Sequence, residues 1–290
     1  MSETGPEPLP PDLQSRRKGG FADAGMRALS ALVLAAVAIA ATWMGGFAFR
    51  VLIVVGSAVI FAEWIGMARK AGRSPRWLVP ALALAALELS LFTQDSGVVL
   101  SVLLVGIACS WATGFFAGRY HAGLAALAYA GFSAVALAFL RDDDRAGLYA
   151  ILFLFSVVWA TDVMAYFCGR LFGGPKLAPS ISPGKTWSGA IGGTAGGIVA
   201  AFVFLFCIGR QPTVGTGIAA LALSVVGQVG DLFESAVKRR YGVKDSSNLI
   251  PGHGGLMDRI DALVAAAFTL YLIGGIMAGF DLPAHGLFRP

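Results

Sequence analysis

Seven acidic side chains occur where the sequence is otherwise apolar. A charged side chain at the centre of a bilayer costs about 2.5–3.5 kcal/mol on insertion scales, so each of these acids is a candidate functional residue. They are Glu63, Glu88, Asp162, Asp231, Glu234, Asp258 and Asp261. The last five adjoin two long polar loops. Glu63 and Glu88 are isolated, and for them a structural hydrogen bond or an interfacial position is an equally good interpretation.

The spacing of the clustered acids indicates where they point. Asp231 and Glu234 are three residues apart, as are Asp258 and Asp261, so each pair shares one face of a helix. Two helices can therefore present carboxylates to one polar cavity, where they repel one another unless a cation neutralises them. Hard oxygen ligands favour Mg²⁺ bound together with substrate phosphates. A proton relay, or ion pairs between helices, is the alternative.

Cationic side chains gather between the two acid pairs. They are Lys238, Arg239, Arg240, Lys244 and Arg259, and the run G-H-G-G at 252–255 stands among them. Glycines let backbone N–H groups approach phosphate oxygens closely, and here they lead into an apolar run that predicts a helix. Together with a metal site, these features predict a pocket for a polyphosphate. A charge run alone is also typical of a solvated or orientation-setting loop.

The composition indicates that a membrane positions these groups. Of 290 residues, 57% are hydrophobic and only 13% are charged, whereas soluble domains carry about 25% charged residues. Because a span needs about 20 apolar residues, we expect an all-α, polytopic membrane protein with nine transmembrane helices. The expected spans are 28–44, 46–67, 77–93, 97–117, 121–140, 146–169, 187–208, 213–233 and 256–280.

The expected spans divide the chain into three parts. Residues 1–27 are polar and rich in proline, which predicts a disordered tail. Residues 28–145 hold the first five spans. Residues 146–290 hold the last four and carry the clustered acids and the loops 170–186 and 234–255. The run G-G-T-A-G-G at 192–197 lies inside an apolar run, so it predicts close helix packing rather than a phosphate loop.

Lys and Arg are distributed unevenly between the two ends of the expected spans. With a cytoplasmic N-terminus, 17 of the 22 Lys and Arg residues fall on the cytoplasmic side, as the positive-inside rule requires. The C-terminus then lies outside, and the clustered acids lie at the cytoplasmic ends of their helices. The net charge of +5 therefore reports orientation, and we expect no nucleic-acid partner.

The segment 235–261 resembles the signature of the phosphatidate cytidylyltransferase (CDP-diacylglycerol synthase) family. It reads S-x-hydrophobic-K-R, four residues, K-D, and later P-x-H-G-G-hydrophobic-x-D-R-x-D. The resemblance continues in the runs 162–170, 182–189 and 227–235, so it covers mainly the half from about 150 onward. The family usually reads S-P-K-K-T-W-E-G where this chain has Gly184 and Ser188, so neither position is given a role.

The resemblance implies a multi-pass enzyme of the inner or plasma membrane, with its site facing the cytoplasm. It implies transfer of CMP from CTP to phosphatidate, which gives CDP-diacylglycerol and pyrophosphate for phospholipid synthesis. It also implies Mg²⁺ held by Asp231 and Asp258, K⁺ as a second cation, and a homodimer. Asp261 would support the metal ligands.

In the implied reaction the phosphate of phosphatidate attacks a phosphate of CTP, so two anionic groups must approach each other. Positively charged groups are therefore expected in the site. The cations assigned to phosphates are Lys238, Arg239, Lys244 and Arg259. His253 either donates to the leaving pyrophosphate or caps the last helix. Asp162 and Tyr166 are one turn apart and could line the same cavity. The further candidates for substrate contacts are Ser182, Lys185, Thr186, Ser235, Gly254 and Gly255, with a cap or turn as the alternative for Ser182.

Two other functions compete with this interpretation. A CTP-dependent polyprenol or lipid kinase would move the phosphoryl group to an alcohol and would need a base. A secondary transporter would place its acids near the bilayer midplane. The gathering of the acids beside a basic, glycine-rich loop favours the nucleotidyl transfer.

Overall fold

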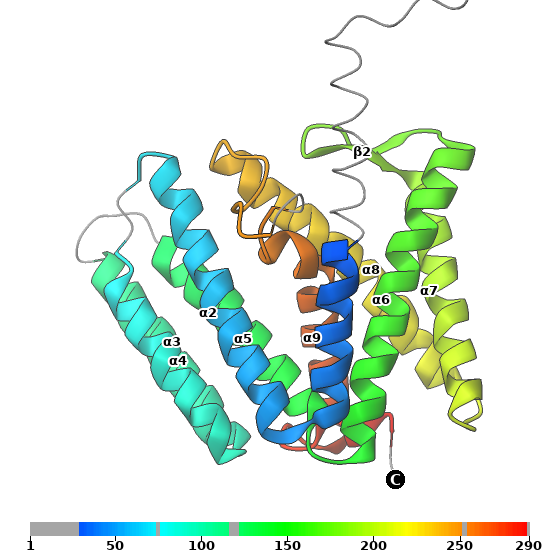
Figure 1. Ribbon diagram of the computed structural model, residues 1–290, viewed down its shortest axis with the longest axis horizontal. Helices are drawn as coiled ribbons and strands as arrows, with labels where there is room; N and C mark the ends of the chain where they lie inside the picture. Colours follow the sequence, from blue (N-terminus) through cyan, green and yellow to red (C-terminus); the bar gives the residue numbers. More distant parts are fainter. Residues whose placement is uncertain (1–28, 74–75, 116–121, 251–253, 289–290) are drawn as a thin grey trace, which may run out of the picture.

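The computed structural model describes residues 29–73, 76–115, 122–250 and 254–288, so the expected tail 1–27 and His253 lie outside the described residues. Most of the described chain is helical (Figure 1). The elements are the helix Leu29–Met44, α2 (Gly46–Lys70), α3 (Leu78–Ser90), the 3-10 turn η1 (Leu91–Thr93), α4 (Ser96–Phe115), α5 (Ala122–Arg141), α6 (Arg145–Phe172), β1 (Lys176–Ala178), β2 (Ser182–Thr186), α7 (Trp187–Cys207), α8 (Val214–Arg240), α9 (Met257–Ala278) and η2 (Pro283–Gly286).

Seven of the described helices, α2 and α4 to α9, are long and apolar enough to cross a membrane. This confirms a polytopic helical membrane protein. The helix Leu29–Met44 and the stretch Leu78–Thr93 coincide with two further expected spans, but each is only 10–17 residues long. The number of nine spans therefore stays a prediction.

Apolar side chains cover both the interior and the exterior of the helix bundle. On α5, Ala130, Ala134 and Leu140 are fully buried. On the outer faces, Leu104 of α4 and Ile276 of α9 are 60% and 80% exposed. A bilayer accepts such apolar outer faces because the helices satisfy their own backbone hydrogen bonds.

Polar side chains set the starts of three helices. Asp144 caps α6, Thr186 caps α7 and Thr213 caps α8. Each accepts a hydrogen bond from the backbone N–H three residues later, at 2.9, 3.1 and 3.1 Å. These bonds satisfy N–H groups that have no partner within the helix.

Both expected polar loops are shorter than the sequence indicates. α8 continues through Lys238 and Arg239 to Arg240, so a loop starting at 234 is wrong. Long basic side chains are good helix formers, and cations stabilise a helix C-terminus. α6 likewise runs to Phe172, and the segment that follows forms the antiparallel hairpin β1–β2, an exception to the all-α prediction.

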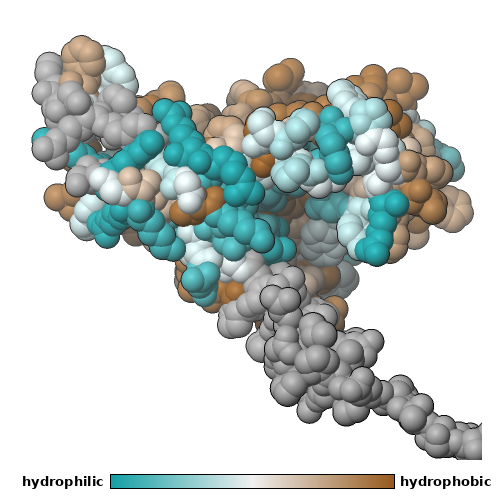
Figure 2. Space-filling view, turned by 90° about the horizontal axis from the view of Figure 1, so that it is seen from above, coloured by the Kyte–Doolittle hydropathy of each residue, from teal (hydrophilic) through white to brown (hydrophobic). Residues whose placement is uncertain are grey.

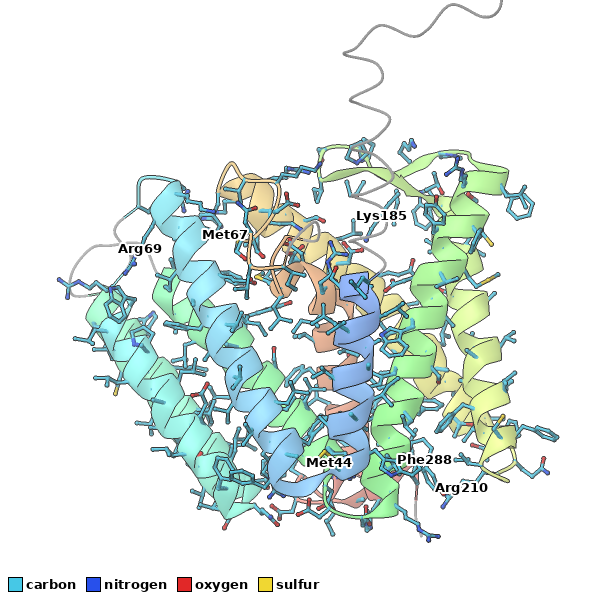
Figure 3. All side chains as sticks on the ribbon, viewed as in Figure 1. Met44, Met67, Arg69, Lys185, Arg210 and Phe288 are labelled. Atoms are coloured by element: carbon cyan, nitrogen blue, oxygen red, sulfur yellow. The ribbon has the colours of Figure 1, made fainter. Side chains whose placement is uncertain are left out.

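The hairpin and the segment 241–250 lie at the same end of the bundle, which we call the polar end (Figure 1). Lys185 and Arg69 lie at this end, whereas Met44, Arg210 and Phe288 lie at the opposite end (Figure 3). Seen from above, hydrophilic residues gather on this face and hydrophobic residues lie toward its margins (Figure 2). The two segments that adjoin the clustered acids in sequence therefore share one end of the molecule.

The glycine run in α7 allows that helix to lie directly against α6. A Cβ atom at Gly193 would lie 2.8 Å from the carbonyl oxygen of Thr161, and one at Gly196 would lie 2.7 Å from Cβ of Met164. Only glycine permits this approach of the two backbones. The prediction that 192–197 serves helix packing is confirmed.

Candidate functional site

A cavity of about 640 Å³ opens beside the hairpin at the polar end. Its walls come from α6, the hairpin, α7 and α8, and Gly169 and Gly189 are among the residues that line it. The polar residues that line it are Asp162, Tyr166, Arg170, Lys185, Thr186, Gln228 and Asp231. Five of these seven are candidates from the sequence, and the structure brings them around one space.

An ion pair joins the hairpin to α8 across this cavity. The ammonium group of Lys185 lies 2.5 Å from Oδ2 of Asp231, with the two side chains 26% and 31% exposed. Oγ of Ser235, one turn later on α8, donates to Oδ1 of Asp231 at 3.4 Å. Lys185 thus supplies the positive charge for a carboxylate that also remains open to the cavity.

Two further carboxylates lie in the electrostatic field of Asp231. Asp162 on α6 interacts with the charges of Asp231 and Lys185. Asp261 on α9 interacts with the charges of Asp231, Asp162 and Lys238. Three helices therefore contribute one carboxylate each to a region with few counter-charges, and such a group of oxygens favours a bound cation.

Asp258 lies at the centre of a second, more buried cluster. Its Oδ2 accepts from the backbone N–H and the hydroxyl of Ser246, both at 2.9 Å, and from the N–H of Gly255 at 2.8 Å. Its Oδ1 accepts from the ammonium group of Lys238 at 2.7 Å. Lys238 also pairs at 2.5 Å with Glu234, whose side chain is fully buried. Lys238 of α8 therefore pairs with a carboxylate of its own helix and with Asp258 of α9, and the second pair joins the two helices.

Glu63 of α2 is hydrogen-bonded to residues that precede and begin α9. Its carboxylate accepts from the hydroxyl of Ser247 at 2.7 Å and from the N–H groups of Leu256 and Met257 at 2.9 and 2.8 Å, and Oγ of Ser246 lies 3.2 Å from its Oε2. Its side chain is buried. The expectation of a structural hydrogen bond for this isolated acid is confirmed, and the bonds reach the segment that carries Asp258.

The glycines before α9 allow the close approach of this segment to the two acids. A Cβ atom at Gly255 would lie 2.0 Å from Oγ of Ser246 and 2.5 Å from Oε1 of Glu63. Gly254 has a φ of +83°, in the left-handed region that favours glycine. The N–H of Gly255 already binds Asp258, so its contribution to a substrate phosphate stays a prediction.

The remaining cations assigned to phosphates lie apart from the buried cluster. Arg239 and Lys244 are exposed at the polar end, and Arg239 donates to the carbonyl oxygen of Val243 at 3.3 Å. Arg259 is exposed and lines a different, apolar cavity between α2, α9 and the helix Leu29–Met44. The structure therefore distributes these three cations over separate positions.

Ser188, which departs from the family pattern, makes structural contacts at the start of α7. Its hydroxyl donates to the carbonyl oxygen of Gly173, which follows α6, and lies 3.1 Å from the hydroxyl of Thr186. Thr186 caps α7, so a cap is present here but Ser182, in β2, does not supply it. Around Gly184 a Cβ atom would meet nothing within 4 Å.

Two polar residues that line the cavity, Gln228 and Arg170, were not predicted from the sequence. Gln228 lines the cavity and donates to the hydroxyl of Thr194 at 3.0 Å. Arg170 lines it too and donates to the hydroxyl of Tyr166 at 2.8 Å. An amide inside an apolar run and a cation four residues after Tyr166 are the signals that could have identified them.

The fold and the site together define a helical membrane protein with carboxylates, cations and a cavity at one end of its spans. A family model described as the cytidylyltransferase family matches residues 25–277, and the chain belongs to this family. The match covers most of the chain, including the first five expected spans, which resembled the family only in hydropathy.

Curated proteins named phosphatidate cytidylyltransferase are similar to this chain. The one from Brucella suis is 43% identical over 266 residues, which cover 89% of this chain and 96% of the relative. The one from Haemophilus influenzae is 47% identical over 142 residues, and the one from Bacillus subtilis is 45% identical over 139 residues. The last two matches cover 49% and 50% of those relatives. The family resemblance seen in the sequence is confirmed.

Proposed function

We propose that this chain transfers CMP from CTP to phosphatidate and releases CDP-diacylglycerol and pyrophosphate. The single observation that carries the proposal is the cavity at the polar end, where Lys185 and Arg170 stand beside Asp162 and Asp231. Such a site offers positive charge to phosphates and oxygen ligands to a divalent cation. The names of relatives along nearly the whole chain support the same reaction.

The reaction itself needs charge neutralisation more than it needs a base. An oxygen of the phosphatidate phosphate attacks the α-phosphorus of CTP, a new P–O bond forms there, and the bond to the β-phosphate breaks. A phosphate monoester is already largely ionised near neutral pH, so the nucleophile is ready. The chain's task is to hold two anions in line and to spread the charge of the leaving pyrophosphate.

The cations of the site are suited to that task. Lys185 of β2 lines the cavity and pairs with Asp231, and Arg170 of α6 lines the same cavity. Both can turn to phosphate oxygens of CTP. Lys238 is held between Glu234 and Asp258, so its charge remains fixed at the boundary between α8 and α9. Arg239 and Lys244 would meet phosphates arriving at the exposed polar end.

Asp231 and Asp258 are proposed to hold Mg²⁺, with K⁺ alongside and Asp261 in support. The donor types fit a hard cation, because the carboxylates of Asp162 on α6 and Asp261 on α9 lie in the field of Asp231 and the hydroxyl of Ser235 is bonded to it. When bound, Mg²⁺ would neutralise phosphate charge and orient the α-phosphate. Lysine ammonium groups already lie against both carboxylates, which marks these oxygens as positions for positive charge.

The polar end is proposed to face the cytoplasm of a bacterial inner or plasma membrane. The support is the excess of Lys and Arg, 17 of 22, on that side of the expected spans. CTP would then enter from the cytoplasm while the acyl chains of phosphatidate stay in the bilayer. A homodimer remains the expectation from the family.

A product analysis tests the proposed function. Purified protein with Mg²⁺, CTP and phosphatidate should release pyrophosphate and form a CDP-lipid, and removal of Mg²⁺ by a chelator should abolish both. Asp258→Asn should lower turnover by about 100-fold or more, since it removes charge from the metal position. Asp143→Asn is the matched control, because Asp143 pairs with Arg50 at 3.1 Å through a half-exposed side chain.

Each rival function has its own outcome in this assay. Formation of CDP and a phosphorylated lipid from a polyprenol would establish the kinase and refute the cytidylyl transfer. Absence of any nucleotide-dependent product, with uptake of a solute into vesicles, would favour the transporter. Near-normal turnover of Asp258→Asn would remove Asp258 from the metal ligands.

A further inference from the structure

A second cavity, of about 400 Å³, lies on the side of α9 away from α8. The helix Leu29–Met44 and α2 form its two sides, α5 and α6 contribute to its floor, and the first turns of α9 complete it. In Figure 1, α9 is visible between α2 and the dark-blue helix Leu29–Met44. Its volume is within the range of small-molecule sites, about 300–1,000 Å³. We call it the apolar groove.

The lining of the apolar groove is hydrophobic except at one position. Leu34 and Ala38, Ile53 of α2, Trp159 of α6 and Leu263 of α9 are among the residues that line it. Among the described lining residues, Arg259 alone carries a charge. An apolar space that contains one cation matches a ligand with hydrocarbon chains and an anionic headgroup.

The apolar groove is directly connected to the proposed reaction site through α9. Leu256, Arg259 and Leu263 fall on one helical face that lines the groove. Asp258, the neighbour of Arg259 in sequence, binds Lys238 of α8 instead. One turn of α9 therefore presents a carboxylate to the cation cluster and a guanidinium to the groove.

We propose that the apolar groove holds the acyl chains of phosphatidate, with the phosphate at Arg259, an inference that rests on the proposed function. The charge complementarity between a phosphate monoester and a guanidinium places the headgroup at the first turn of α9. The acyl chains then lie along α9 between α2 and the helix Leu29–Met44. The lipid phosphate then lies at the N-terminal end of α9, the end that also carries Asp258 and its partner Lys238.

Gly56 of α2 offers a way to fill the apolar groove without disturbing the fold. It lines the groove, its φ is not positive, and a Cβ atom there would meet only Cδ2 of Leu256, at 4.0 Å. Gly66 of the same helix is the matched control, because a Cβ atom there would meet nothing within 4 Å and Gly66 does not line the groove. Both glycines are half-buried.

The test compares Gly56→Phe, Gly66→Phe and the unaltered protein in detergent micelles. Gly56→Phe should raise KM for dioleoyl phosphatidate by at least about tenfold, because the ring occupies space that the chains need. KM for CTP and turnover of dihexanoyl phosphatidate should change less than about twofold. Gly66→Phe should match the unaltered protein with both lipids.

Lipid binding without CTP provides a second measurement that does not depend on turnover. Dioleoyl phosphatidate should raise the melting temperature of the unaltered protein and of Gly66→Phe, but not of Gly56→Phe. Equal stabilisation of the three proteins, or equal KM values, would overturn the inference and leave the groove to bulk lipid. If the unaltered protein forms no CDP-lipid, the proposed function fails, and the melting temperatures still decide whether the groove binds phosphatidate.

Discussion

Glu63, in the N-terminal half of the chain, is hydrogen-bonded to the segment that carries Asp258 of the proposed reaction site. Its carboxylate accepts three hydrogen bonds, and the donors lie 184 to 194 residues away along the chain. A sequence pattern reports neighbours three or four residues apart, so it could identify Glu63 as an unusual acid but not its partners. The acid pairs of α8 and α9, by contrast, were predictable because their spacing is local.

Replacement of Glu63 by Gln should therefore affect both stability and turnover. An amide offers one acceptor oxygen where the carboxylate offers two, so at least one of the three donors would face an NH₂ group. We expect a loss of about 2 kcal/mol or more in the free energy of unfolding. Turnover should fall as well, because the segment that positions Asp258 is released. Thermal unfolding in detergent and pyrophosphate release measure the two effects.

Glu88→Gln is the control for this change. Glu88 also lies in an apolar helix, but it accepts one hydrogen bond, from the hydroxyl of Ser57 at 2.8 Å, and Gln can still accept it. Its effect on unfolding should be clearly smaller, and turnover should be kept. Equal losses for the two variants would mean that the bonds from Glu63 to the segment 246–257 have no special importance.

Two helix caps allow an effect on stability to be distinguished from an effect on substrate binding. Thr186 and Thr213 cap α7 and α8 through equivalent bonds of 3.1 Å, but only Thr186 lines the cavity beside the hairpin. Thr186→Ala and Thr213→Ala should each cost about 1 kcal/mol in unfolding. Thr186→Ala should also raise KM for CTP about three- to tenfold, because it removes a hydroxyl from the cavity wall.

Steady-state kinetics and thermal unfolding of both variants test this prediction. Thr213→Ala should leave KM for CTP unchanged, since Thr213 starts α8 at the end opposite to the cavity. A similar rise in KM for both variants would indicate that loss of helix stability alone explains the effect. No rise for either would remove Thr186 from the substrate contacts.

The positions of the described helices and most of their ends were predictable, and only the end of α8 differs by more than three residues. Continuous apolar runs located each expected span within a few residues of a helix, because a bilayer demands long apolar helices. The end of α8 at Arg240 was missed because the charged residues 238–240 were read as a loop, although such residues continue a helix well. The hairpin in 176–186 was missed because its strands are only three and five residues long.

The two ends of the whole molecule make the proposed orientation testable. In a background with Cys109, Cys168 and Cys207 replaced by Ser, Gly184→Cys lies in the hairpin and Gln211→Cys lies exposed between α7 and α8. A membrane-impermeant maleimide should label Gly184→Cys only from the cytoplasmic face and Gln211→Cys only from the outer face. Inverted and right-side-out vesicles allow the comparison.

Labelling from the reversed faces would overturn the proposed orientation and the cytoplasmic entry of CTP. Labelling of both positions from one face would contradict the passage of α7 across the membrane. The distribution of Lys and Arg along the sequence predicted the orientation, whereas the location of the hairpin and the segment 241–250 at one end of the bundle is a result of three-dimensional packing (Figure 1).

The backbone contact between α6 and α7 has a consequence for the cost of binding. At Gly193 and Gly196 α7 carries no side chain, so α6 and α7 pack closely against each other along this stretch. The hairpin that joins α6 to α7, with Lys185 near its end, is attached at both ends to this pair of helices. A nucleotide that enters beside it therefore finds a wall already in place, and little conformational entropy is lost on that side of the cavity.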